Sequence, residues 1–325
     1  MANTTDLPGM TAPGQAPQGA LARWWTYQRE RFPLAAHAPL IAAFSFCMVS
    51  YASVVRGYLR VPAPEELCVA FASAFIFFLQ LRIADEFKDR EIDARYRPYR
   101  PVPRGLVSLR ALGAVGIGGG GVQLALALWL SPALLPFLLV TWLYLGLMTR
   151  EFFVARWLKA HPIVYLWTHM LIMPLIDLYD TACNWRTEGA AAPTALLFLL
   201  GVSFCNGFVV ELGRKIRSPR DEERGVETYS ALWGRRRAVC AWYGALLATA
   251  LSAWLAAGRI GFALAETVGS LVLLAGAATI VVCFLRHPRA GRGAQIETFS
   301  GIWTLFVYLS LGALPLAWQL IAQGG

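Results

Sequence analysis

The amino-acid sequence predicts an all-α protein that crosses a membrane nine times. Hydrophobic residues make up 57% of the 325 positions and charged residues only 15%, and the mean hydropathy is +0.50. This composition excludes an ordinary soluble domain. Two further observations support the prediction: the number of long apolar stretches, and the uneven placement of lysine and arginine between them.

Nine apolar stretches are long enough to cross the hydrocarbon core as helices, which takes about 20 residues each. They cover residues 34–56, 67–84, 107–130, 133–149, 161–180, 192–213, 237–257, 264–285 and 298–322. No connecting segment is long enough to form a soluble domain. We therefore expect one nine-helix transmembrane domain over residues 22–325.

Lysine and arginine gather on one side of these spans. All but four of the 29 lie in segments on the side of the N-terminus, the exceptions being Arg56, Arg60, Arg186 and Arg259. Since cytoplasmic loops carry such an excess, we expect the N-terminus inside and the C-terminus outside the inner (cytoplasmic) membrane. The formal net charge of +9 follows from this asymmetry and requires no nucleic-acid partner.

The segment before the first span divides into two parts. Residues 1–21 are rich in Pro, Gly, Thr and Ala, which predicts a disordered tail without a signal peptide. Residues 22–32 mix aromatic side chains with arginines, which predicts a helix at the membrane interface. The six cysteines have no metal-ligand spacing and are interpreted as small packing residues.

A cluster of carboxylates follows the second span. At about 100° per residue, Asp85, Glu86, Asp89 and Asp93 fall within an arc of roughly 100° on a helix, while Lys88 points elsewhere. Four like charges beside a membrane require a counter-ion, and oxygen ligands favour Mg²⁺ bound together with a substrate phosphate. The alternative is an acidic surface neutralised by nearby arginines.

Side chains one and more turns before this cluster share its helix face. Arg82 needs a partner at this depth, and Asp85, Glu86 or Asp89 is the expected one. Aromatic residues, Phe75 and Phe78 among them, form a stripe that suits an apolar ligand and the stabilisation of a cation by ring faces. Ordinary helix packing is the alternative explanation for the stripe.

Residues 85–108, DEFKDREIDARYRPYRPVPRGLVS, resemble the first signature of the UbiA superfamily of intramembrane prenyltransferases. That signature reads N-D-x-x-D-x-x-x-D and then R-P-x-R-P-x-P-x-G. Asp85 stands at the asparagine, and Glu86, Asp89 and Asp93 stand at the three aspartates. The resemblance implies a nine-helix bundle with a cytoplasmic-side active site, Mg²⁺, and an isoprenoid phosphate or diphosphate as substrate.

The second signature of the family, D-x-x-x-D followed by G-x-x-T, is altered here. Gly225, Thr228 and Asp221 match, but Arg217 replaces the first aspartate. Arg214, Lys215 and Arg217 could instead bind phosphate directly, with fewer metal ions, or they could contact lipid headgroups. Ser-Pro at 218–219 predicts the start of a short helix that carries Asp221 in its first turn.

These arguments assign roles to particular residues. The predicted metal ligands are Asp85, Glu86, Asp89, Asp93 and Asp221. The predicted catalytic residues are Asp89, Asp93, Arg100 and Lys215. The predicted substrate-binding residues are Arg82, Arg97, Arg100, Arg156, Lys159, Arg214, Lys215, Arg217, Asn206, Phe75, Phe78 and His169. Asp177 and Asp180 are expected near the opposite surface and receive no role.

The expected function is that of a Mg²⁺-dependent transferase in the lipid bilayer, which moves a prenyl group to an unknown acceptor and releases diphosphate. A terpene cyclase and a polyprenyl-phosphate phosphoribosyltransferase are alternatives within the same family. A transporter or permease is an alternative of another class, although no paired discontinuous helices are evident. A metal-free lipid-binding relative remains a further possibility.

Overall fold

The computed structural model describes residues 19–58 and 60–324. Every regular element in these residues is helical, and nine helices among them are long and apolar enough to cross a membrane. The predicted all-α fold with nine spans is thus confirmed. Most of the predicted disordered tail, residues 1–18, lies outside the described residues.

The helices follow one another with short connections. They are α1 (Ala20–Arg31), α2 (Leu34–Val55), α3 (Pro64–Lys88), α4 (Arg90–Tyr96), α5 (Leu109–Leu130), η1 (Pro132–Leu134), α6 (Leu135–Thr149), η2 (Glu151–Phe153), α7 (Ala155–Ala160), α8 (Pro162–Met170), α9 (Ile172–Trp185), α10 (Leu196–Arg214), α11 (Tyr229–Trp233), α12 (Arg235–Gly258), α13 (Ala263–Arg286), α14 (Arg292–Leu311) and α15 (Ala313–Gly324).

Two of the nine spans are each made of two α-helices that meet within the bundle. The fifth span joins α8 to α9, and Pro174 in the first turn of α9 lacks the N–H that would continue the helix from α8. The ninth span joins α14 to α15 at Gly312, where a Cβ would lie 2.4 Å from the Cys47 Cα of α2. A glycine is therefore required for this close approach of backbones.

The core of the bundle lies between α2, α9, α10 and α14. In it α2 packs against α3, α9 and α14, while α10 packs against α9, α12 and α14. Large side chains such as Met48, Tyr179, Trp242 and Trp303 are fully buried there. This packing fixes the ends of α3 and α10, which carry most of the predicted site residues.

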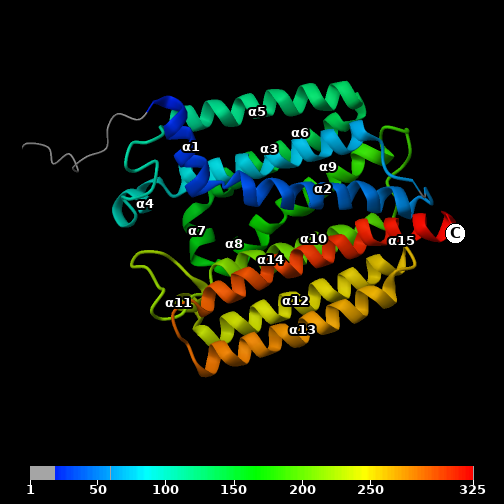
Figure 1. Ribbon diagram of the computed structural model, residues 1–325. Helices are drawn as coiled ribbons and strands as arrows, with labels where there is room; N and C mark the ends of the chain where they lie inside the picture. Colours follow the sequence, from blue (N-terminus) through cyan, green and yellow to red (C-terminus); the bar gives the residue numbers. More distant parts are fainter. Residues whose placement is uncertain (1–18, 59, 325) are drawn as a thin grey trace, which may run out of the picture.

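The two ends of the bundle differ in the short helices that they carry. Figure 1 shows α1, α4 and α11 at one end and the C-terminal helix α15 reaching the other. Helix α1 covers the predicted interfacial segment and is attached by the buried rings of Tyr27 and Phe32. The end of the bundle that carries α1, α4 and α11 is called the site end below.

Candidate active site

The acidic segment does not continue as one helix through Asp93. Helix α3 ends at Lys88, Asp89 takes a non-helical conformation (φ −87°, ψ 1°), and α4 begins at Arg90. The expected single arc of four carboxylates is therefore wrong. A short acidic side chain such as that of Asp89 favours helix ends, because it competes for backbone hydrogen bonds. The break turns Asp93 into the protein, where it is buried.

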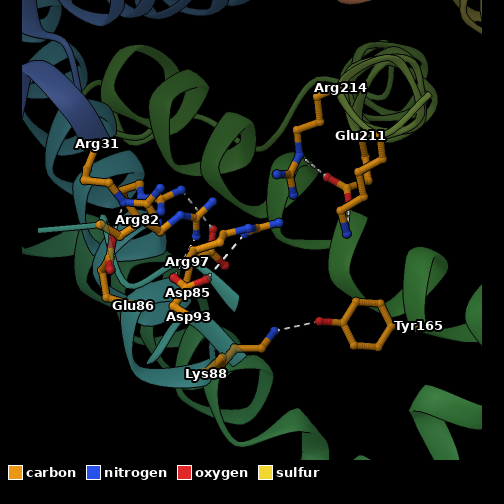
Figure 2. Close-up of polar contacts among 12 residues, drawn as sticks. Arg31, Arg82, Asp85, Glu86, Lys88, Asp93, Arg97, Tyr165, Glu211 and Arg214 are labelled. Atoms are coloured by element: carbon orange, nitrogen blue, oxygen red, sulfur yellow. Dashed lines mark hydrogen bonds and ion pairs between the residues drawn. The ribbon is translucent and has the colours of Figure 1, made fainter. Parts of the chain in front are cut away.

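Glu86 is held by two arginines. Its carboxylate lies 2.5 Å from Arg31 Nε of α1 and 3.0 Å from an Arg82 Nη of its own helix. The expectation that Arg82 is paired is confirmed, since Arg82 also lies 3.7 Å from Asp85. Glu86, predicted as a metal ligand, thus joins α1 to α3 (Figure 2).

Asp93 is held by two arginines in the same way. The guanidinium groups of Arg97 and Arg100 lie 3.4 Å and 2.7 Å from its two oxygens. Arg97 also reaches Glu223, at 3.3 Å, in the connection between α10 and α11. The predicted phosphate-binding arginines are therefore positioned by the buried Asp93 carboxylate.

Glu211 on α10 forms a third cluster of this kind. Its two oxygens lie 2.5 Å from Arg214 Nε and 2.9 Å from Lys215 Nζ. Arg214 faces Asp85 across the site end, and Figure 2 shows the two residues on facing walls. We call these three groups the cation-pair clusters, because each joins one carboxylate to two cations.

Asp85 and Asp89 are the two carboxylates of the acidic segment that these clusters leave available. Asp85 has only the 3.7 Å contact with Arg82, and in the described part of the chain no cation lies within 4.0 Å of Asp89. Burial, together with the negative charge of Asp85, raises the pKa of Asp89 above its usual value. A cation between the two carboxylates would remove that repulsion.

Two carboxylates on adjacent turns fit Mg²⁺, which typically takes one or two carboxylates and completes its shell with phosphate and water. Within residues 19–58 and 60–324, no group of three or more His, Cys, Asp or Glu side chains could hold a metal ion. The donor set therefore suits a metal that arrives with a phosphate ligand. The five-residue metal site remains a prediction.

Lys88 has contacts that its angular position on the predicted helix did not reveal. Its Nζ donates to the Tyr165 hydroxyl at 2.8 Å and lies 3.0 Å from His169 Nε2, both on α8. Figure 2 shows Lys88 extended toward Tyr165. Sequence reasoning placed His169 at the site but set Lys88 aside. The four-residue spacing of Tyr165 and His169, which puts both on one helix face, was the available signal.

The connection between α6 and α7 closes the α8 side of the site end. Glu151, Phe152 and Phe153 all take left-handed conformations, with φ of 48°, 52° and 60°. This turn places the Phe152 ring edge-on to Tyr144 and His169, at centroid distances of 5.5 and 6.1 Å. Of the predicted phosphate-binding residues here, Lys159 lies 3.8 Å from Glu151, and Arg156 is exposed.

The altered second signature forms a loop rather than the short helix expected at Ser218. That expectation is wrong, because the next helix after α10 is α11, whose N-cap is Thr228. Thr228 also donates to Glu222, at 2.7 Å. Gly225 has a φ of 78°, and a Cβ there would lie 2.5 Å from the Tyr96 ring of α4. The matched glycine and threonine thus hold the loop against α4 and start α11.

Two predicted site residues of this loop are engaged with α14. The Asp221 carboxylate accepts a hydrogen bond of 2.8 Å from the Gly291 amide. Arg217 lies 3.0 Å from Glu297 of α14. The structure therefore attaches both residues to the start of the ninth span and not to the carboxylates of α3.

The remaining predicted residues lie deeper in the bundle. Phe75 packs on Phe32 and lines an apolar cavity of about 650 Å³ between α1 and α3, whereas Phe78 packs on Phe44 of α2. Asn206 accepts a hydrogen bond of 3.3 Å from Thr304 and so joins α10 to α14. The aromatic stripe is thus divided between two helix contacts.

Asp177 and Asp180 are fully buried among the helices of the bundle. The fifth span runs to Trp185, five residues beyond the expected end, and places both carboxyl groups inside the bundle. Neither carboxyl has a hydrogen-bond partner within the described chain.

Comparison with solved structures identifies the fold. An apo UbiA homolog from Aeropyrum pernix K1 matches with a TM-score of 0.63 and 15% identity, over 88% of this chain and 98% of that one. A digeranylgeranylglyceryl phosphate synthase matches with a TM-score of 0.57 and 14% identity, over 92% and 99%. A UbiA homolog from Archaeoglobus fulgidus bound to GPP and Mg²⁺ matches with a TM-score of 0.52 and 13% identity, over 88% and 99%.

Comparison at the level of sequence families agrees with the fold. No protein of curated function matches the sequence. The family described as the UbiA prenyltransferase family matches over residues 43–306, which include all nine spans in whole or in part. Because this match covers well over half of the chain, it shows that the chain belongs to the UbiA prenyltransferase family.

Proposed function

We propose that this protein is a Mg²⁺-dependent prenyltransferase that uses a prenyl diphosphate, transfers the prenyl group to an acceptor and releases diphosphate. The observation that carries the proposal is the pair of available carboxylates, Asp85 and Asp89, framed by three clusters that each join one carboxylate to two cations. A metal ion and a diphosphate bound together would neutralise the negative and positive charges of such a site better than either would alone.

The solved relatives support this assignment. Two of the structures that resemble this chain are UbiA homologs from Archaeoglobus fulgidus bound to Mg²⁺, one with DMAPP and one with GPP. In this chain Asp85 and Asp89 would hold the ion. When bound, Mg²⁺ would neutralise charge on the phosphate oxygens and so assist departure of the diphosphate.

The protein's own cations would bind the rest of the diphosphate. Arg100, fixed by Asp93, and Arg214 and Lys215, fixed by Glu211, stand on facing walls of the site end. Because each cluster is already assembled, these donors need little rearrangement as negative charge collects on the leaving group. The C–O bond breaks with its electron pair going to the diphosphate, and the prenyl carbon bonds to the acceptor, which loses a proton.

The direct test is diphosphate release by the purified full-length protein in detergent. The protein is incubated with geranyl diphosphate and a membrane lipid extract, with and without Mg²⁺, and products are identified by mass spectrometry. We expect Mg²⁺-dependent release together with a prenylated product. Absence of release from any prenyl diphosphate tried, from dimethylallyl to polyprenyl, would contradict the proposal.

The same experiment separates the alternatives. A terpene cyclase releases diphosphate from the donor without any acceptor and yields a cyclic hydrocarbon or alcohol. A phosphoribosyltransferase consumes phosphoribosyl diphosphate with a polyprenyl phosphate and leaves prenyl diphosphates intact. A transporter moves substrate across vesicles and releases no diphosphate. The inward position of the site end relative to the cell, expected from the positive-inside rule, is part of the proposal.

A further inference from the structure

An apolar cavity lies at the site end, on a side of α3 that the proposed metal site does not use. It has a volume of about 650 Å³ and lies between α1, α3 and α5 (Figure 1). Apart from Tyr27 and Gln28, its lining side chains are aliphatic or aromatic, such as Leu79 of α3 and Val115 of α5. At about 100° per residue, Asp85 lies about 120° around α3 from Leu79, so the cavity does not face the available carboxylates.

Two unpartnered polar groups lie at one end of this cavity. A row of lining side chains on α3 runs from Phe75 to Ile83, and Glu86, which pairs with Arg31 of α1, follows on the same side of the helix. Tyr27, one turn before Arg31, also lines the cavity. The Tyr27 hydroxyl and one Arg31 Nη are buried and have no hydrogen-bond partner in the described chain. Both can donate, so this end of the cavity suits a ligand with acceptor oxygens.

The cavity opens toward the surroundings of the bundle. Leu21 and Trp25 of α1 and Val115 of α5 line it and are exposed as well. Around a protein with nine spans these surroundings are lipid, and a helix that mixes tryptophan with arginine lies at the lipid interface. Arg29, one turn after Trp25, is exposed, and no carboxylate of the described chain lies within 4.0 Å of its guanidinium. The opening therefore carries an unpaired positive charge.

We propose that this cavity binds one anionic phospholipid, with an acyl chain along the α3 row and the phosphate oxygens at Tyr27, Arg29 and Arg31. The orientation agrees with that of the bilayer, because the polar groups lie at the site end and the apolar row runs from there into the spans. Arg31 also holds Glu86, so the bound lipid would fasten α1 to the end of α3. This lipid is not the substrate, and the inference does not depend on the function proposed above.

The test compares two lipids with the same acyl chains, anionic dioleoylphosphatidylglycerol and zwitterionic dioleoylphosphatidylcholine. Each is added to the full-length protein after purification in detergent and removal of bound lipid. Melting temperature and native mass spectrometry measure binding. We expect phosphatidylglycerol to raise the melting temperature in a saturable way and to be retained as a single molecule per chain, and phosphatidylcholine to bind more weakly.

Two variants locate the acyl chain. Val115→Phe fills the cavity from α5 and should abolish both the retained lipid and the rise in melting temperature. Ile117→Phe, at a position on the same helix that is 81% exposed and does not line the cavity, is the matched control. Gel filtration shows whether each variant is folded, and Ala22→Phe, which fills the cavity from α1, replaces Val115→Phe if that variant is not.

Two further variants test recognition of the headgroup. Arg29→Gln should weaken the binding of phosphatidylglycerol roughly fivefold, because an arginine near the membrane surface attracts anionic lipid, and should leave the binding of phosphatidylcholine unchanged. Arg236→Gln, at an exposed position on α12, is the matched control for loss of one positive charge.

Three results would overturn the inference. Equal binding of the two lipids by the unaltered protein would mean that the headgroup is not recognised. Equal retention of phosphatidylglycerol by Val115→Phe and Ile117→Phe would place the lipid outside this cavity. Loss of the bound lipid on addition of geranyl diphosphate would make the cavity part of the substrate site. None of these measurements depends on turnover, so they remain decisive even if the protein has no prenyltransferase activity.

Discussion

Helices α3 and α10 form facing walls of the site end and use their carboxylates in opposite ways. On α10, Glu211 is surrounded by Arg214 and Lys215 from the next turn of the same helix. At the end of α3, Asp85 and the next residue after the helix, Asp89, are available, because the nearby arginines are bound to Glu86 and Asp93 instead. On the function proposed above, the metal would be held from one wall, while the other wall would act through its cations.

Replacing the two available carboxylates should have the largest effect. Asp85→Ala and Asp89→Ala each remove a carboxylate that would hold Mg²⁺, so we expect kcat/KM for diphosphate release to fall by roughly a hundredfold or more. Glu91→Gln, at an exposed position on α4, is the control. If Glu91→Gln lowered activity as much, the loss could not be attributed to the two carboxylates proposed to bind the metal.

Glu86→Gln tests whether this carboxylate stabilises the fold or binds the metal ion. Because Glu86 is buried between Arg31 and Arg82, its loss should lower stability by about 3 kcal/mol and loosen α1. The measurements are the melting temperature and tryptic cleavage within α1. The Mg²⁺ concentration for half-maximal activity should not change, and a large increase in it would make Glu86 a ligand after all. Glu65→Gln is the matched control.

Glu211→Gln addresses the facing wall. Its partners are half-exposed, so we expect a smaller loss of stability, about 2 kcal/mol, and an unchanged requirement for Mg²⁺. Inorganic diphosphate should restore part of the melting temperature, because Arg214 and Lys215 then regain an anionic partner. A requirement for several times more Mg²⁺ in this variant would place a metal ion on α10 as well.

The smallest effect is expected at the opposite end of the bundle. The Arg56 guanidinium donates to Glu188 and holds the pKa of that carboxyl below its usual value of about 4.5. The resulting stabilisation is present above pH 4.5 and is lost as the pH falls through the lowered value. The pair is partly exposed, so it contributes less than about 1 kcal/mol. Glu188→Gln should flatten the melting temperature between pH 5 and pH 3, while the unaltered protein shows a decline.

The spans were predictable because each depends on a local property, a run of apolar residues, and the structure confirms all nine. Their ends were less so. The fifth span extends to Trp185 across polar residues, since Asp177 and Asp180 are covered by neighbouring helices that local hydropathy does not reveal.

The sequence motif of the acidic segment was predictable, but the directions of its carboxylates were not. Helix periodicity treats Asp85 to Asp93 as one face, whereas the chain breaks at Asp89. Which carboxylates remain available depends on arginines far away in sequence, such as Arg31, whose pairing with Glu86 spans 55 residues. Lys88 illustrates the same limit, because its direction was correctly excluded from the acidic face but its partners lie on α8.

The excess of cations over carboxylates at the site end also concerns the surrounding lipid. Anionic headgroups at a membrane surface are attracted by about 1 kcal/mol for each nearby lysine or arginine. Such headgroups carry the same phosphate oxygens as the proposed substrate and compete for the same donors. On the function proposed above, the apparent substrate affinity would then depend on the bilayer composition as well as on the polypeptide.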